Sequence, residues 1–128
     1  MSARRPVQTE NAPKAIGPYS QGVVAGDLVF TSGQIPMTPS GELVMGSIAA
    51  AARQSLANVL AVLQAGGAEP QDVVKVTVYL TDMGTFAAVN EIYDQVFSEP
   101  YPARSCVEVA RLPGDVPIEI EAVARVPQ

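Results

Sequence analysis

The sequence predicts an α+β fold, with a mixed β-sheet that carries two helices on one face. Apolar residues alternate along five segments, as in strands, and recur every three or four residues along two others, as in helices. Their order, β-β-α-β-α-β-β, favours a sheet with both helices on one side. The 128 residues are 48% apolar and 16% charged, without an internal repeat or linker, so residues 1–128 are expected to form one domain.

The first third of the chain is predicted to contain an arm, a hairpin and a loop. Residues 1–13 are polar and contain proline, which is typical of a loosely held N-terminal arm. Two β-rich runs, Gln21–Val24 and Leu28–Ser32, flank Ala25-Gly26-Asp27, and this spacing predicts a hairpin with a glycine-assisted turn. The stretch 36–46 holds two prolines and two glycines and is expected to be an irregular loop.

Two helices are predicted from their spacing and their end signals. Ser47 is a typical N-cap, and Gly66-Gly67 is a typical helix end. Between them, helical spacing is kept by Ala52, Leu56, Val59, Leu60 and Leu63. Asp82 can cap a second helix, which Pro100-Tyr101-Pro102 ends. The apolar stripe of this helix consists of Phe86, Val89, Tyr93, Val96 and Phe97.

Three further strands are predicted, at 73–80, 104–109 and 118–126, the last two separated by a turn at 112–115. The strand 73–80 alternates strictly. One face carries Val74, Val76, Val78 and Leu80, and the other carries Val73, Lys75, Thr77 and Tyr79. Because the helices are expected on one side only, the other face of the sheet is expected to be covered by a partner subunit.

The composition excludes several kinds of chemistry. The chain has no histidine and a single cysteine, Cys106, which excludes a histidine-activated nucleophile, an intrachain disulfide and a zinc site built on His and Cys. Acid–base work is left to carboxylates, tyrosine, lysine or water. The net charge of −5, with scattered cations, disfavours a nucleic-acid partner. Neither a signal peptide nor a membrane-spanning run is evident, so a cytoplasmic location is expected.

Five segments carry candidate functional groups, and each also has an ordinary structural explanation. They are Gly17–Ser20, Thr31–Gln34, Asn90, Arg104–Cys106 and the pair Glu119 and Glu121. The ordinary explanations assign these residues no role in catalysis or binding. In chain order, they are a loop tyrosine, a strand end with a glycine bend, an exposed asparagine, a surface cation and the solvated face of a strand. For Arg104, the functional alternative is bidentate binding of a carboxylate.

Taken together, these segments closely resemble the reactive-intermediate (imine) deaminase A family. The resemblance runs from about Glu10 to Arg125. It rests on five motifs in the family's order: Ala15–Gln21, Ser32–Pro36, Val89–Tyr93, Pro102–Pro113 and Ile118–Ala122. The connection 98–101 departs from the pattern, because it is shorter than in many members, so the resemblance does not fix the shape of this loop or its effect on the cleft.

The resemblance implies a chorismate-mutase-like α+β domain that assembles as a homotrimer, with active sites in clefts between subunits. It also implies hydrolysis of 2-imino acids and their enamine tautomers to 2-oxo acids and ammonia, without a cofactor or a metal. Such imines are released by pyridoxal-phosphate enzymes, so the implied role is protection of the cell from reactive enamines.

The resemblance also assigns residues to the site. Arg104 matches the arginine that holds the substrate carboxylate, and Glu119 matches the glutamate associated with the attacking water. Gly33 matches the glycine that lets the backbone approach the ligand. Other positions that line or support the cleft are Tyr19, Ser32, Asn90 and Cys106. Since no histidine is present to activate it, Cys106 is expected to line the site and not to act as a nucleophile.

Two alternatives belong to another functional class. One is a non-catalytic module that binds small carboxylates, and the other is a holdase-type chaperone. A carboxylate sensor needs Arg104 but not Glu119, so the presence of both residues favours the enzyme. A ribonuclease, another activity credited to relatives, is disfavoured by the acidic charge and the missing histidine.

Overall fold

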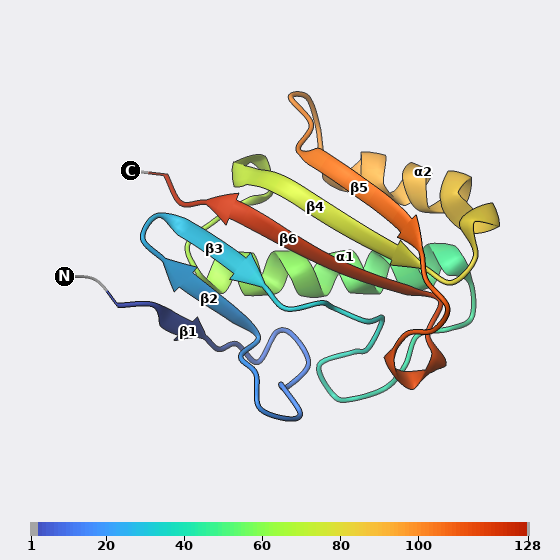
Figure 1. The fold of residues 1–128 in the computed structure, drawn as a ribbon, viewed down its shortest axis with the longest axis horizontal. Coiled ribbons are helices and arrows are strands. Elements are labelled where there is room, and N and C mark those ends of the chain that lie inside the picture. The colour runs from blue at the N-terminus through green and yellow to red at the C-terminus, as the bar shows by residue number, and fades with distance from the viewer. Residues whose placement is uncertain (1–2, 128) are drawn as a thin grey trace.

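The computed structural model describes residues 3–127 and contains a six-stranded sheet with both helices on one face (Figure 1). The elements are β1 (Arg5–Val7), β2 (Gly22–Ala25), β3 (Leu28–Thr31), α1 (Ile48–Ala65), β4 (Val73–Leu80), α2 (Phe86–Val96), β5 (Ala103–Glu108) and β6 (Ile118–Arg125). Single turns of 3₁₀-helix occur at Pro70–Asp72, Met83–Thr85 and Pro113–Asp115. The predicted α+β class is confirmed.

The order of strands in the sheet is β1-β2-β3-β6-β4-β5. All neighbours are antiparallel except β4 and β5, which are parallel, so the predicted mixed sheet is confirmed. The last strand of the chain, β6, lies in the middle of the sheet, between β3 and β4 (Figure 1). Strand β5, which carries Arg104, lies at the edge.

Helix α1 forms where its spacing predicts it. The Ser47 side chain accepts a hydrogen bond from the Ala50 N–H (3.1 Å), and Gly67, at φ +100°, follows the last turn. A left-handed residue just after a helix is the common position for glycine. The buried face of α1, which includes Leu56, Val59 and Leu63, packs against β3, β6 and α2.

The hairpin and the second helix are also confirmed. Strands β2 and β3 pair through a turn in which Gly26 has φ +61°. Asp82 accepts a hydrogen bond from the Gly84 N–H (2.8 Å) and caps the 3₁₀ turn Met83–Thr85, which leads directly into α2. The helix buries Val89, Ile92 and Tyr93 against the core.

The alternation predicted for β4 is wrong at its first two residues. Val74 is exposed and Val73 is buried, the reverse of the prediction. The reason is a β-bulge: Val73 pairs with Ala124 and Lys75 pairs with Val123, so Val74 has no partner on β6. An extra residue in one strand reverses the facing of the residues before it.

The N-terminal segment is also held more firmly than the sequence predicts. Residues 5–7 form β1 on the edge of β2, and Val7 is buried. The buried side chain of Gln21 binds the segment that follows, because its Nε2 donates to the carbonyls of Thr9 (3.0 Å) and Pro13 (2.8 Å). The expectation of a loose arm is therefore incorrect for residues 5–13, while residues 1 and 2 lie outside the described part.

Candidate functional site

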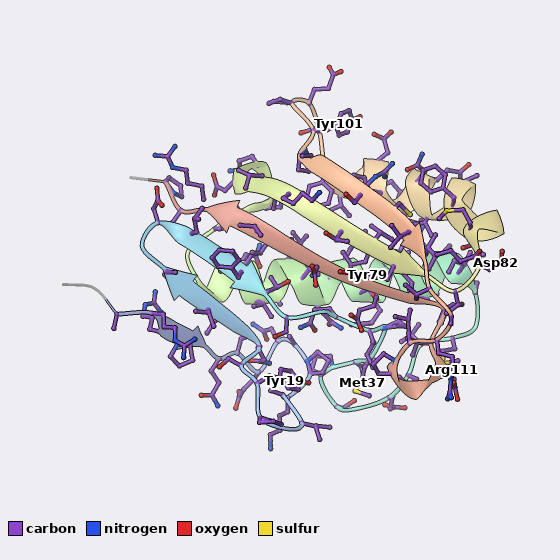
Figure 2. The ribbon with its side chains drawn as sticks, in the orientation of Figure 1. Tyr19, Met37, Tyr79, Asp82, Tyr101 and Arg111 are labelled. Carbon is purple, nitrogen blue, oxygen red and sulfur yellow. The ribbon has the colours of Figure 1, made fainter. Side chains whose placement is uncertain are left out.

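One group of the predicted site residues gathers around Glu119, on the sheet face turned away from the helices. Glu119 pairs with Tyr79 on β4, and Tyr79 lies over the sheet on the side opposite α1 (Figure 2). The side chain of Glu119 reaches Gly33 so closely that a Cβ built on this glycine would overlap the carboxylate. We call Ser32, Gly33 and Glu119 the glutamate cluster.

Backbone pairing fixes Gly33 at this position. The Gln34 N–H donates to the Ile120 carbonyl (2.7 Å), and the Ile120 N–H donates to the Gln34 carbonyl (3.1 Å). On the other side, the Ser32 hydroxyl donates to the Ser20 carbonyl (2.5 Å). The segment after β3 is thus tied both to β6 and to the loop before β2.

Tyr19 lies in the loop before β2, next to Ser20, whose carbonyl binds the Ser32 hydroxyl. The Tyr19 side chain is half-exposed, and its hydroxyl accepts a hydrogen bond from the Ile16 N–H (3.3 Å). Tyr19 and Ser20 line a cavity of about 860 Å³ whose other walls come mainly from residues 6–15. The loop that carries Tyr19 is therefore tied to Ser32, but the cavity that Tyr19 lines is not lined by Gly33 or Glu119.

The proton affinity of Glu119 is altered by its surroundings. Burial raises the pKa of its carboxyl, and the charge of Glu121, two residues along the same face, raises it further. Tyr79, whose hydroxyl donates to Glu121 (3.3 Å), lies beside the pair. A carboxylate with a raised pKa accepts and returns protons near neutral pH more readily than an ordinary glutamate does.

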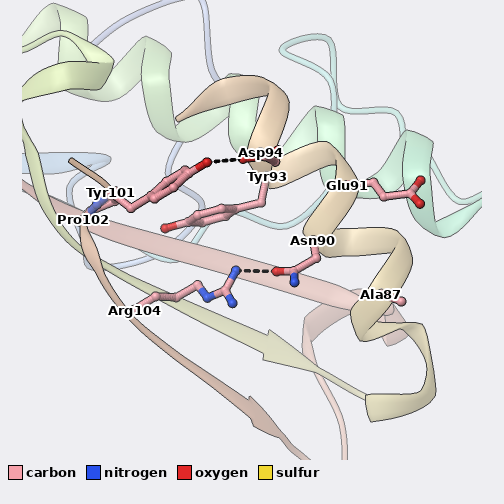
Figure 3. Close-up of a pocket in the computed structure, with 8 residues that line it drawn as sticks. All are labelled: Ala87, Asn90, Glu91, Tyr93, Asp94, Tyr101, Pro102 and Arg104. Carbon is pink, nitrogen blue, oxygen red and sulfur yellow. Dashed lines mark hydrogen bonds between the residues drawn. The ribbon is translucent and has the colours of Figure 1, made fainter. Parts of the chain in front are cut away.

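A second group forms around Arg104, between β5 and α2 (Figure 3). The Arg104 Nη1 donates to the Asn90 Oδ1 (2.7 Å). The guanidinium lies over the rings of Tyr93, at 4.6 Å from the centroid, and Phe86, at 5.3 Å. A pocket of about 600 Å³ opens here. It is lined by Ala87, Asn90, Glu91, Tyr93, Asp94, Tyr101, Pro102 and Arg104. We call Asn90, Arg104 and Cys106 the arginine cluster.

Cys106 follows two residues later on β5 and is partly buried. Burial raises the pKa of its thiol, and the positive charge of Arg104 opposes this only in part. The residue is therefore a neutral thiol at neutral pH, and a thiol is a poor nucleophile. This agrees with a lining role.

The two clusters do not meet within one chain. In the sheet register, Arg104 is aligned with Val76 and Glu119 with Tyr79, and residues an odd number of positions apart face opposite sides. The strands β5 and β6 flank β4, so the two backbones are two strand spacings of about 4.8 Å apart and are offset by about 10 Å along β4. A small molecule cannot touch both side chains of one chain.

Three residues that lie beside the two clusters, Phe86, Tyr93 and Tyr79, are not among the site residues predicted from the sequence. Phe86 and Tyr93 were assigned to the apolar stripe of α2, although their spacing to Asn90, three and four residues, places all three on one face of the helix. Tyr79 is the partner of Glu119 in the sheet, and this pairing is not visible in the sequence pattern, whereas Glu119 and Glu121 are already placed on one face by the alternation of their strand.

Within residues 3–127, no group of three or more Cys, Asp and Glu side chains is arranged to hold a metal ion. In the same range, no helix is both long and apolar enough to cross a bilayer.

Comparison with known proteins places the chain among proteins of the same fold and length. The profile of the family described as Endoribonuclease L-PSP matches residues 9–126. The protein named 2-iminobutanoate/2-iminopropanoate deaminase of Escherichia coli is 55% identical over 121 residues, covering 92% of this chain and 94% of its own length. The RutC family protein PH0854 of Pyrococcus horikoshii is 57% identical, with coverage of 91% and 93%.

Solved structures agree with these relatives. The crystal structure of E. coli TdcF with bound serine has a TM-score of 0.91 and 50% identity, covering 96% of this chain and 99% of that one. Yeast Mmf1 has a TM-score of 0.95 and 42% identity, with coverage of 98% and 100%. The chain belongs to the Endoribonuclease L-PSP family, and to the reactive-intermediate deaminase A proteins within it.

Proposed function

We propose that this protein hydrolyses 2-imino acids, and the enamines in equilibrium with them, to 2-oxo acids and ammonia. The observation that carries the proposal is the presence of two complementary clusters, one cationic and one with a carboxylate of raised pKa. Relatives named 2-iminobutanoate/2-iminopropanoate deaminase, at 55% identity over most of the chain, support it. In this reaction, Arg104 binds the substrate carboxylate and Glu119 handles the attacking water.

The reaction needs little from the protein, because the carbon of a protonated imine is already electrophilic. Glu119 takes a proton from water while the water oxygen bonds to the imine carbon, which gives a tetrahedral amino alcohol. The same carboxyl then returns the proton to the nitrogen. As ammonia leaves, the Glu119 carboxylate takes the proton of the hydroxyl group, the carbonyl forms, and the proton passes to ammonia or to water. Arg104 holds the adjacent carboxylate through a charge-assisted fork, which contributes about 1.5–3 kcal/mol.

The site requires two chains. In a 2-imino acid the carboxylate is bonded directly to the imine carbon, so the arginine and the glutamate must approach within a few ångströms of each other. Since Arg104 and Glu119 of one chain face opposite sides of the sheet, we assign them to one site across an interface between two copies. The homotrimer implied by the family resemblance supplies three such interfaces.

The outer face of the sheet suits such an assembly. It presents Phe30 and Val107, which are 41% and 42% exposed, around the central polar residues. Apolar side chains at this exposure are typical of a face that packs against a partner.

The biological role that follows is protection against reactive enamines, which pyridoxal-phosphate enzymes release as imine tautomers. The bound serine in the TdcF structure supports a preference for small molecules with a 2-amino or 2-imino acid core. A non-catalytic carboxylate sensor would need the arginine cluster alone, so the glutamate beside Gly33 favours an enzyme over a sensor.

The proposal is tested by generating 2-iminobutanoate in situ with a dehydratase and following its disappearance. The wild-type protein should accelerate hydrolysis, and Arg104→Ala should lose the acceleration. Arg111→Ala is the matched control, because Arg111 is an exposed arginine that forms an ion pair with Asp115 (2.9 Å) and does not line the pocket around Arg104. A wild-type protein without acceleration, or an Arg104→Ala variant with full activity, would contradict the proposal.

A further inference from the structure

The guanidinium of Arg104 is held entirely by neutral groups. Asn90 accepts one hydrogen bond through its Oδ1, and the rings of Tyr93 and Phe86 lie against the guanidinium at 4.6 and 5.3 Å. Both ion pairs of residues 3–127 involve other arginines, Arg111 with Asp115 and Arg125 with Asp27. The positive charge of Arg104 is therefore not paired with a carboxylate of residues 3–127.

The two acidic residues that line the pocket, Asp94 and Glu91, do not form an ion pair with Arg104. Asp94 accepts a hydrogen bond from the Tyr101 hydroxyl (2.5 Å), and the Glu91 side chain points away from Arg104 (Figure 3). The three residues that do contact the guanidinium, at positions 86, 90 and 93, lie on one face of α2. The helix thus presents one amide and two aromatic rings to Arg104, and its carboxylates Glu91 and Asp94 do not pair with the guanidinium.

Tyr93 contributes through its ring. Tyr93 is only 5% exposed, and its ring packs on Phe97 with the ring centroids 4.7 Å apart. Its hydroxyl is one of two buried side-chain polar atoms that make no hydrogen bond among residues 3–127. The interaction that Tyr93 makes with Arg104 is therefore that of an aromatic face with a cation, for which a rigid, packed ring is well suited.

We propose, on the basis of the proposed function, that Asn90 and Tyr93 are positioning residues that preorganise Arg104 for the substrate carboxylate. Asn90 occupies Nη1 and Tyr93 holds the guanidinium plane, so Nη2 and Nε remain available to a ligand carboxylate. An arginine fixed before binding loses less rotamer entropy when the ligand arrives. Neutral partners are essential to this role, because a carboxylate in place of the amide would compete with the substrate for the same cation.

The proposal gives each variant a distinct expectation. Tyr93→Leu and Asn90→Ala should each weaken binding of 2-oxobutanoate by roughly threefold to tenfold, with a matching rise in KM and little change in kcat. Tyr93→Phe keeps the aromatic ring and should bind 2-oxobutanoate with the wild-type affinity. Asn90→Asp keeps the acceptor oxygen and the fold, but pairs with Arg104 as an anion, and should weaken binding at least as much as Asn90→Ala does.

Phe97→Leu is the matched control, because Phe97 is a buried aromatic residue beside Tyr93, while the Arg104 guanidinium lies over the rings of Tyr93 and Phe86. It should lower the Tm without changing the affinity for 2-oxobutanoate. The experiment measures this affinity by calorimetry, the kinetics of imine hydrolysis, and the Tm of the same full-length variants.

The possible outcomes separate this proposal from the proposed function. Wild-type protein that binds 2-oxobutanoate in an Asn90-dependent manner but hydrolyses no imine would overturn the deaminase and support the positioning role. Active protein whose KM is unchanged in Tyr93→Leu and Asn90→Ala, or equally changed in Phe97→Leu, would overturn the positioning role. Wild-type protein that neither binds 2-oxobutanoate nor hydrolyses the imine would overturn both.

Discussion

The carboxylate of Glu119 occupies the space that a side chain on Gly33 would need. A Cβ built on this glycine meets three side-chain atoms of Glu119, from Cγ to Oε2. The position of Gly33 is itself fixed, because Gln34 exchanges two backbone hydrogen bonds with Ile120, the neighbour of Glu119 on β6. The glycine is therefore required by the glutamate and not by its own backbone conformation.

Gly33→Ala tests this relationship. The added methyl group should displace the Glu119 carboxylate, which lies at the end of a flexible side chain, so turnover should fall by about tenfold or more while the Tm changes little. Gly46→Ala is the matched control, since a Cβ there meets no atom within 4 Å. Imine hydrolysis and thermal unfolding of both variants provide the measurement. Equal activity of the two variants would contradict the proposed role of Gly33.

The raised pKa of Glu119 predicts a trade-off between activity and stability. Because the folded-state pKa lies above the value of about 4.3 in an unfolded chain, the folded protein binds this proton more tightly. The stability from this group is fully present below pH 4.3 and is lost as the pH rises through the folded-state pKa. At pH 7.5 the ionised carboxylate therefore destabilises the fold.

Glu119→Gln should accordingly lose turnover, retain 2-oxobutanoate binding and raise the Tm at pH 7.5 by about 2–4 °C. The increase should shrink toward zero near pH 4. Thermal unfolding across this pH range is the measurement, and Glu42→Gln controls for net charge because it removes a carboxylate from an exposed loop. A variant that keeps full turnover, or whose Tm falls at pH 7.5, would be inconsistent with this account.

The loop that follows Gly33 is predicted to depend on Asn58 of α1. This fully buried amide donates to the carbonyls of Ile35 (3.2 Å) and Met37 (2.8 Å). Asn58→Ala should destabilise the protein by about 1–3 kcal/mol, because two backbone carbonyls lose their donor. Chemical denaturation measures the loss, with Gln54→Ala as control, since Gln54 donates a hydrogen bond to the Asn58 Oδ1 (2.9 Å) but none to the loop carbonyls of Ile35 and Met37. A loss no greater than that of the control would rule out this role.

The sequence predicted most of the fold because most of it depends on local patterns. Ser47 and Gly67 define the ends of α1, and the alternation of β6 follows its burial residue by residue. The two errors both concern tertiary pairing. The bulge at Val74 depends on the register with β6. The position of residues 9–13 depends on hydrogen bonds from the buried amide of Gln21, which lies 12 residues after Thr9 and 8 residues after Pro13.

The candidate site shows the same division. Motif resemblance indicates which residues matter, but only the register of three strands shows that Arg104 and Glu119 of one chain lie on opposite faces. Likewise, periodicity assigned Tyr93 to the core, which is correct, while its contact with Arg104 depends on how α2 crosses β5. The sequence pattern alone therefore could not predict the contacts between different helices and strands.

The central claim is that each site takes Arg104 from one chain and Glu119 from another. It is tested most directly by mixing two inactive variants, Arg104→Ala and Glu119→Gln, unfolding and reassembling them together, and assaying imine hydrolysis after native mass spectrometry has verified mixed assemblies. Random reassembly of equal amounts should make about one quarter of the sites intact and restore a similar fraction of wild-type activity. Mixed assemblies as inactive as either parent would contradict the claim.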